Sequence, residues 1–428
     1  MQKDILKIAL PSIVSNITIP LLGLVDTAIV GHLGRTAFIG AIAVGGMIFN
    51  MIYWVFGFLR MGTGGFAAQA HGADRPEECQ RILLRSLMVG LLAATVLVLL
   101  QEVISYTAFR WVEAEADVEQ YALSYFRILI WGAPAVLGLY SFNGWFLGRQ
   151  NARYPMGIAI IQNMVNIAMS LWLVMGLGLK VEGVAIGTLV AQYTGFFIAI
   201  WFYLSHYRSE LRHTSFRRLW ADGALGRFFS VNRDIVLRTV CLVAVTTAFT
   251  SIGAKQGNVV LAVNSLLMQF FLLFSYIMDG FAYAGEALGG RYFGAGDVCS
   301  LRRLTYRLFF FGAALSLLFT IIYMLGGSSL LQLLTDQEEV SRAAEAYLPY
   351  AVAIPFISFA AFLFDGLFIG CTDTRPMLLT MLCATAAFFG LSHLLNPLGN
   401  HALWLAFLSY LFLRGAIQLL FWKKNLSA

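Results

Sequence analysis

The amino-acid sequence predicts an all-α polytopic membrane protein, with twelve transmembrane helices in two six-helix lobes related by pseudo-twofold symmetry. The composition is that of a membrane protein, because 59% of the 428 residues are hydrophobic and only 12% are charged. The mean hydropathy is +0.75, whereas soluble domains carry about twice this share of charged residues. The hydrophobic residues form long runs, and motifs in the second half of the chain repeat those of the first.

Twelve apolar runs are long enough to cross a hydrocarbon core, which takes about twenty helical residues. Runs of more than thirty residues indicate helices that are tilted or extend beyond the bilayer. An even number of spans places both termini on the same side of the membrane. The runs cover approximately 5–31, 37–70, 80–110, 118–148, 154–178, 182–206, 234–254, 258–293, 302–327, 340–370, 376–396 and 401–422.

The loops between these runs alternate in charge. Basic loops contain residues such as Arg75, Arg149 and Arg375. The intervening loops are acidic or nearly neutral, as at Asp117 and Glu338. Because Lys and Arg are retained on the cytoplasmic side of a membrane, we expect a multi-pass protein of the cytoplasmic (inner) membrane with both termini in the cytoplasm. The arginines and lysines of these loops account for the net charge of +6. The positive charge therefore gives no reason to expect a nucleic-acid partner.

An internal repeat divides the chain into halves. FNGWFLGRQNARYPM (142–156) and FDGLFIGCTDTRPML (364–378) align at an offset of 222 residues, and the same offset pairs Gly72 with Gly294. Such repeats are typical of secondary transporters, and an offset of six spans keeps the orientation of each helix. The repeat predicts an N-terminal lobe over 1–206, a cytoplasmic linker over 207–233 and a C-terminal lobe over 234–428.

The first run, 5–31, contains one carboxylate, Asp26, together with Pro11 and Pro20. An acid at bilayer depth costs about 2.5–3.5 kcal/mol on insertion scales and usually faces a protein interior or a hydrated path. Proline removes a backbone hydrogen bond and permits a bend. At the repeat offset Asp26 corresponds to Ala248, so the acid occurs in one half only. We therefore expect a bending helix in which Asp26 exchanges an ion; a carboxyl that only pairs with another buried group would give the same pattern.

Uncharged polar residues accompany this acid in the N-terminal half. Several are spaced three or four residues apart, so that they share a helix face. Each alone is explained by hydrogen bonding between helices, but together with an acid they predict a hydrated proton or cation site. The residues are Asn143, Gln162, Asn163, Asn166, Ser170, Thr188 and Gln192.

Candidate substrate-contacting residues occur in both halves of the chain. Carboxylates beside aromatic rings and methionines suit a lipophilic cation, although Phe and Met that face lipid would give the same composition. Asp279, Tyr283 and Glu286 share one face of run 258–293. The predicted cavity residues are Gln162, Asn163, Gln192, Met268, Phe271, Asp279, Tyr283, Glu286 and Asp365.

These motifs resemble the multidrug and toxic compound extrusion family, and most of all its DNA-damage-inducible F branch. The resemblance covers nearly the whole chain and includes NARYPMGIAIIQNMVNIAMS (151–170) and VEGVAIGTLVAQY (181–193). It implies two lobes flanking a central cavity, and export of organic molecules in exchange for protons or sodium ions.

The resemblance also implies an ion-coupling site. Its members are Asp26 and Asn143, with Asn166 and Thr188, while Ser170 stands where the family has a second aspartate. The absence of that carboxylate favours protons over sodium as the coupling ion.

Two other functions fit parts of the pattern. A lipid-linked precursor flippase would need a cationic cavity for phosphate, but the intramembrane charges are mostly acidic, with Arg238 an exception. A membrane-embedded enzyme would need metal-binding acids or a nucleophile with its base, and the chain contains no DDxxD, HExxH or GxSxG motif. We therefore expect no catalytic residue, metal site or cofactor apart from the transported ion. The expected partners of a monomeric protein are small organic substrates and membrane lipids.

Overall fold

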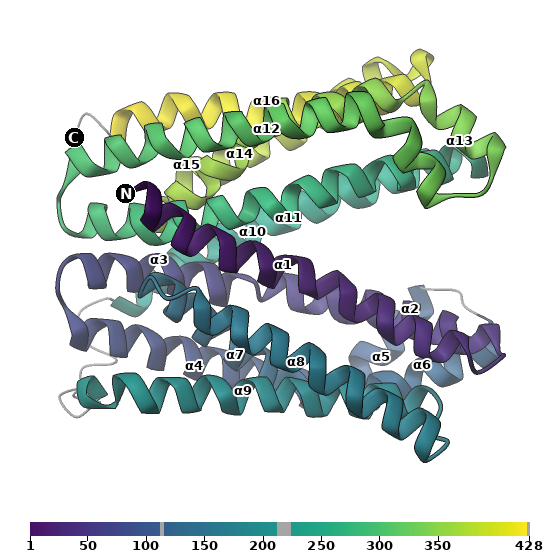
Figure 1. Cartoon of the computed structure of the whole chain (residues 1–428), viewed down its shortest axis with the longest axis horizontal. Helices are drawn as coiled ribbons and strands as arrows, with labels where there is room; N and C mark the ends of the chain where they lie inside the picture. The colour runs from purple at the N-terminus through teal and green to yellow at the C-terminus, as the bar shows by residue number, and fades with distance from the viewer. Residues whose placement is uncertain (112–114, 212–223, 426–428) are drawn as a thin grey trace. The chain divides into compact units, whose positions relative to one another are not determined.

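The computed structural model describes residues 1–111, 115–211 and 224–425, which are helical over most of their length (Figure 1). Within these residues, twelve helical segments are long and apolar enough to cross a membrane. The predicted fold class and number of spans are therefore confirmed.

Several of the predicted runs in the first half are interrupted. The run 37–70 forms two helices that meet at Phe56 and Gly57, and a 3₁₀ turn at Ile130–Gly132 divides the run 118–148. Gly57 is a weak helix former, and Pro134 cannot donate the backbone hydrogen bond of a helix interior. The helices are α1 (Gln2–Gly31), α2 (Thr36–Val55), α3 (Phe58–Gly72), α4 (Pro76–Leu99), α5 (Gln101–Trp111), α6 (Ala116–Leu129), α7 (Ala133–Gly148), α8 (Arg153–Leu171) and α9 (Val181–Leu211).

The second half follows the same order. The predicted run 340–370 divides at Tyr347, because Pro349 is accommodated in the first turn of a new helix. A 3₁₀ turn at Asn396–Leu398 separates the last two helices. The helices are α10 (Ala224–Lys255), α11 (Asn258–Gly294), α12 (Val298–Leu334), α13 (Glu338–Glu345), α14 (Leu348–Gly370), α15 (Thr374–Leu394) and α16 (Asn400–Asn425).

The helices form two compact units. The N unit comprises Val14–Arg227, and the C unit comprises Met1–Ile13 together with Phe228–Ala428. Helix α1, one continuous ribbon in Figure 1, therefore belongs to both units, and the division falls between Pro11 and Pro20. Part of the predicted linker 207–233 lies outside the described residues, at 212–223.

The sequence repeat is also a repeat of packing within each unit. A Cβ atom at Gly144 of α7 would lie 2.1 Å from the carbonyl oxygen of Arg60 in α3. A Cβ atom at Gly366 of α14 would lie 2.1 Å from the carbonyl oxygen of Ala282 in α11. Both pairs are related by the offset of 222 residues. Only glycine permits these backbone contacts, so equivalent positions in the two units can be compared directly.

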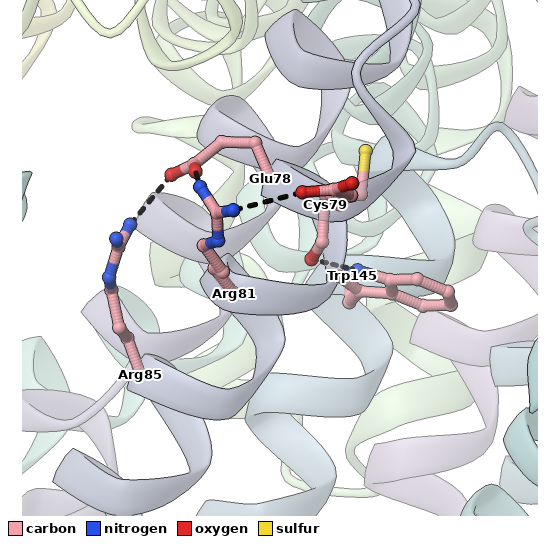
Figure 2. A network of polar contacts seen from close by, with 6 residues as sticks. Glu78, Cys79, Arg81, Arg85 and Trp145 are labelled. Carbon is pink, nitrogen blue, oxygen red and sulfur yellow. Dashed lines mark hydrogen bonds and ion pairs between the residues drawn. The ribbon is translucent and has the colours of Figure 1, made fainter. Parts of the chain in front are cut away.

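Polar contacts hold the start of α4, next to one of the basic loops (Figure 2). Glu78 accepts hydrogen bonds from Arg85 at 2.7 Å and from Arg81 at 3.2 Å. The indole nitrogen of Trp145 in α7 donates to the backbone carbonyl of Cys79 at 2.7 Å. Arg81 and Arg85 are thus partly neutralised within their own helix, and Trp145 connects α4 to α7.

Candidate functional site: two buried aspartates

Asp26 lies in the N unit, near the end of α1, and is 4% exposed. Its Oδ2 atom is 3.4 Å from the hydroxyl of Thr188 in α9. The side-chain amide of Asn166 in α8 donates to the same hydroxyl at 2.8 Å. The structure thus brings together three of the five residues predicted for ion coupling, each from a different helix.

The hydrogen bonds available to Asp26 are weak. The hydroxyl of Thr188 carries one hydrogen, and this hydroxyl also lies 3.0 Å from the carbonyl oxygen of Val184. The Oδ1 atom of Asp26 has no hydrogen-bond partner in the protein. Among the residues that the structure describes, no ion pair includes Asp26. An isolated carboxylate is costly in an apolar interior, so this carboxyl group is suited to binding a proton.

Ser170 continues the polar face of α8 next to Asn166. It is fully buried, and a Cβ atom at Gly187 of α9 would lie 2.4 Å from its hydroxyl oxygen. Neither the Ser170 hydroxyl nor the Oδ1 atom of Asn166 has a partner in the protein. Buried oxygen atoms of this kind normally accept a hydrogen bond from water or bind a ligand. The site therefore offers oxygen atoms and a single carboxyl group.

The other predicted residues of the N unit have different surroundings. Asn163 donates to the carbonyl oxygen of Thr18 in α1 at 3.0 Å, and Gln162 donates to that of Ala191 in α9 at 3.4 Å. Both amides therefore connect helices. No hydrogen bond joins Asn143 of α7 to Asp26 within the described ranges. The side-chain oxygen of Gln192 is buried without a partner.

Tyr125 of α6 also belongs to this site, although no sequence pattern predicts it. This residue is buried, and its hydroxyl interacts with the side chain of Thr188 and with the charge of Asp26. Its ring occupies space that Gly45 of α2 leaves free, since a Cβ atom there would lie 2.5 Å from the ring. In sequence, Tyr125 cannot be distinguished from the aromatic residues that membrane helices place at interfaces.

Asp365 of α14 lies in the C unit and is 6% exposed. Its Oδ2 atom accepts a hydrogen bond from Arg414 of α16 at 2.6 Å and another from Arg238 of α10. Its Oδ1 atom accepts one from Gln418 of α16 at 2.7 Å. Three donors, two of them cationic, hold this carboxylate in its charged form and join three helices. Of these three donors, only Arg238 was singled out from the sequence; Arg414 was not, although an arginine inside an apolar run is itself a signal of function.

The remaining predicted residues lie on α11 of the C unit. Asp279 and Tyr283 are partly exposed, whereas Glu286 is buried. The charge of Asp279 also acts on Arg414. The ring of Phe271 lies 5.5 Å from that of Phe407, and Met268 is partly exposed. Acids and aromatic rings are thus present together in the C unit.

Comparison with known proteins agrees with this architecture. The family model MatE matches residues 11–172 and 235–394. DNA damage-inducible protein F of Escherichia coli is 37% identical over 99% of this chain and 92% of its own length. A probable multidrug resistance protein NorM of Thermotoga maritima is 22% identical over 99% of this chain and 94% of its own length.

Solved structures share the fold. A MATE crystal structure in the bent conformation superposes with a TM-score of 0.89 at 18% identity, over 99% of this chain and 95% of that one. A MOP superfamily transporter from Pyrococcus furiosus superposes with a TM-score of 0.86 at 19% identity, over 100% of this chain and 96% of that one.

Repeated bundles of membrane-spanning helices with buried polar sites define a polytopic membrane transport protein. The chain belongs to the MatE family, whose members are transporters and not enzymes. The resemblance found in the sequence is confirmed.

Proposed function

We propose that this protein is a secondary antiporter that exports lipophilic organic cations across the cytoplasmic membrane in exchange for protons. The environment of Asp26 carries the proposal, because this buried carboxyl group in a membrane-spanning helix has only neutral hydrogen-bond partners. The relative named as a probable multidrug resistance protein supports export of organic compounds as the activity. We expect the protein to act as a monomer with both termini in the cytoplasm, without a bound cofactor.

Asp26 would carry the transported proton on its own carboxyl group. A buried carboxyl without a cationic partner avoids the cost of isolated charge by binding a proton. A proton taken up from outside and released inside also moves with the membrane potential, which contributes about 2.3 kcal/mol per charge per 100 mV. Because α1 carries Asp26 and belongs to both units, we propose that protonation changes the bend of α1 at Pro11 or Pro20.

Protons are favoured over sodium by the chemistry of the ligands. Hard cations bind to several oxygen atoms, with carboxylates supplying the compensating charge. The oxygen atoms near Asp26 come from the neutral residues Asn166, Ser170 and Thr188. A proton needs only one O–H bond to the carboxyl group of Asp26, whereas a sodium ion of the same charge would need several of the neutral oxygen atoms as well to complete its shell.

For the substrate, the best-supported chemical class is an organic cation. Asp279 is partly exposed on the same helix face as Tyr283, and its charge also acts on Tyr276. A carboxylate beside aromatic rings attracts cations through charge and through the faces of the rings. A flippase for anionic lipid-linked precursors is less well supported, because Arg238 and Arg414 are both bound to Asp365.

Transport in proteoliposomes tests the proposal. Efflux of a fluorescent organic cation is measured under an imposed pH gradient or an imposed sodium gradient, for the wild type, Asp26→Asn and Asp4→Asn. Asp4 is a matched control, since it lies on the same helix with its side chain 50% exposed. Efflux driven by the pH gradient in the wild type and Asp4→Asn, and lost in Asp26→Asn, is expected. Efflux that requires sodium would refute proton coupling, and normal efflux by Asp26→Asn would refute the role of Asp26.

A further inference from the structure

We infer that Arg414 is a tethered cation that restricts access of organic cations to the carboxylates of the C unit, and that it thereby sets the affinity for substrate. The inference rests on the proposed function, since it presumes that Asp279 contributes to an organic-cation site.

The surroundings of Arg414 are those of a bound organic cation. Its guanidinium donates to Asp365 at 2.6 Å, and the carbon at its centre lies 5.4 Å from the centroid of the Tyr410 ring. The charge of Asp279, on a different helix, also acts on it. A carboxylate, an aromatic face and a second nearby acid are the groups that recognise guanidinium and ammonium compounds. Here the protein supplies the cation itself.

Arg414 is not needed to neutralise Asp365. One cation compensates one carboxylate, and Asp365 already accepts hydrogen bonds from Arg238 and Gln418. Both arginines approach the same oxygen atom of Asp365, and the Nε atom of each is buried without a partner in the protein. If the two arginines served only stability, more of their N–H groups would have hydrogen-bond acceptors. Neutralisation of Asp365 therefore does not account for Arg414, on which the charge of Asp279 also acts.

The repeat indicates that the fold does not require these charges. At the offset of 222 residues, Asp365 corresponds to Asn143, Arg238 to Asn16 and Arg414 to Gln192. The N unit thus has three neutral amides at positions where the C unit has three charges, with the same glycine packing nearby at Gly144 and Gly366. The charged set serves a purpose specific to the C unit.

The arrangement has a direct effect on affinity. Asp279 is partly exposed, whereas Arg414 is 3% exposed. An organic cation that approaches Asp279 is attracted by this carboxylate and repelled by the guanidinium. Neutralising Arg414 removes the repulsion and leaves Asp365 paired with Arg238.

Binding of tetraphenylphosphonium to the purified full-length protein tests the inference without requiring transport. Arg414→Gln copies the residue of the N unit and should bind this monocation about tenfold more tightly than the wild type, a difference of about 1.4 kcal/mol. Arg414→Lys keeps the charge and should bind as the wild type does. Arg238→Gln should give no gain, because it leaves Arg414 in place. Thermal unfolding of each variant identifies those that fail to fold.

Two further measurements decide the interpretation. In the double variant Asp279→Asn with Arg414→Gln, the gain in affinity should be lost; a gain that persists would overturn the inference. Tetraphenylborate, an anion of similar size, should not bind more tightly to Arg414→Gln. If Arg414→Gln gains affinity for this anion as well, the substitution acts through shape and not through charge, and the inference is wrong. If the wild type binds and exports cations but Arg414→Gln shows no gain, the inference alone fails; if neither protein binds a cation, the proposed substrate class fails with it.

Discussion

Asp26 and Asp365 are both buried aspartates of membrane-spanning helices, but their partners differ. Asp26 has a distant hydroxyl at 3.4 Å and one oxygen atom without a partner. Asp365 accepts hydrogen bonds from two guanidinium groups and an amide. Burial alone therefore does not assign a role to an intramembrane acid. The first carboxyl group lacks partners that would stabilise its charge and is suited to binding a proton, whereas the second is held in its charged form by its neighbours.

The largest expected effect on stability is that of Asp365→Asn. This change removes the carboxylate that Arg238 and Arg414 both bind, and breaking a buried ion pair costs about 3–5 kcal/mol. Thermal unfolding of the purified protein in detergent should show a large decrease in melting temperature. The comparison with Asp26 would fail if Asp365→Asn melted like the wild type.

A combined variant separates charge from packing. Changing Asp365→Asn, Arg238→Asn and Arg414→Gln together places the residues of the N unit at the equivalent positions of the C unit. Because no charge is then left unpaired, most of the stability lost in Asp365→Asn should return. A triple variant that is as unstable as the single one would mean that the C unit depends on the geometry of the arginines and not on charge balance.

The opposite result is expected for the stability of Asp26→Asn. Asparagine has nearly the same shape as aspartate, and the hydrogen bonds of Asp26 are long or absent. The free energy of unfolding should therefore change by about 1 kcal/mol or less. The melting temperatures of Asp26→Asn and Asp365→Asn, measured in parallel, test this difference in stability. A decrease as large as that of Asp365→Asn would indicate that Asp26 has a strong partner.

The smallest effect is expected for Tyr125→Phe. The ring still fills the space beside Gly45, but the hydroxyl near Asp26 and Thr188 is lost. A hydrogen bond contributes about 1 kcal/mol, so the initial rate of efflux driven by the pH gradient should fall about fivefold, with unchanged melting. An unaltered rate would exclude Tyr125 from the site.

The sequence was sufficient to predict the spans and the repeat and to single out Asp26, which the structure shows to be buried, because hydropathy and an acid within an apolar run are local signals. Interruptions such as the one at Phe56 and Gly57 were missed, since a membrane helix tolerates glycine in many places. The partners of Asp365 were also missed. Arg238 lies 127 positions away in sequence and Arg414 lies 49 positions away, and no periodicity indicates which face of each helix turns toward the others.

The division of α1 between the units has a consequence for dissecting the chain. Within the C unit, a Cβ atom at Gly280 would lie 2.8 Å from the carbonyl oxygen of Ala9, so the first residues of the chain pack closely on α11. A fragment that begins at Phe228 would lack this segment of its own unit, and the complementary fragment would carry it. Cleaving the backbone once therefore cannot release two self-sufficient halves. The first thirteen residues therefore make the C unit depend on the part of the chain that carries the N unit.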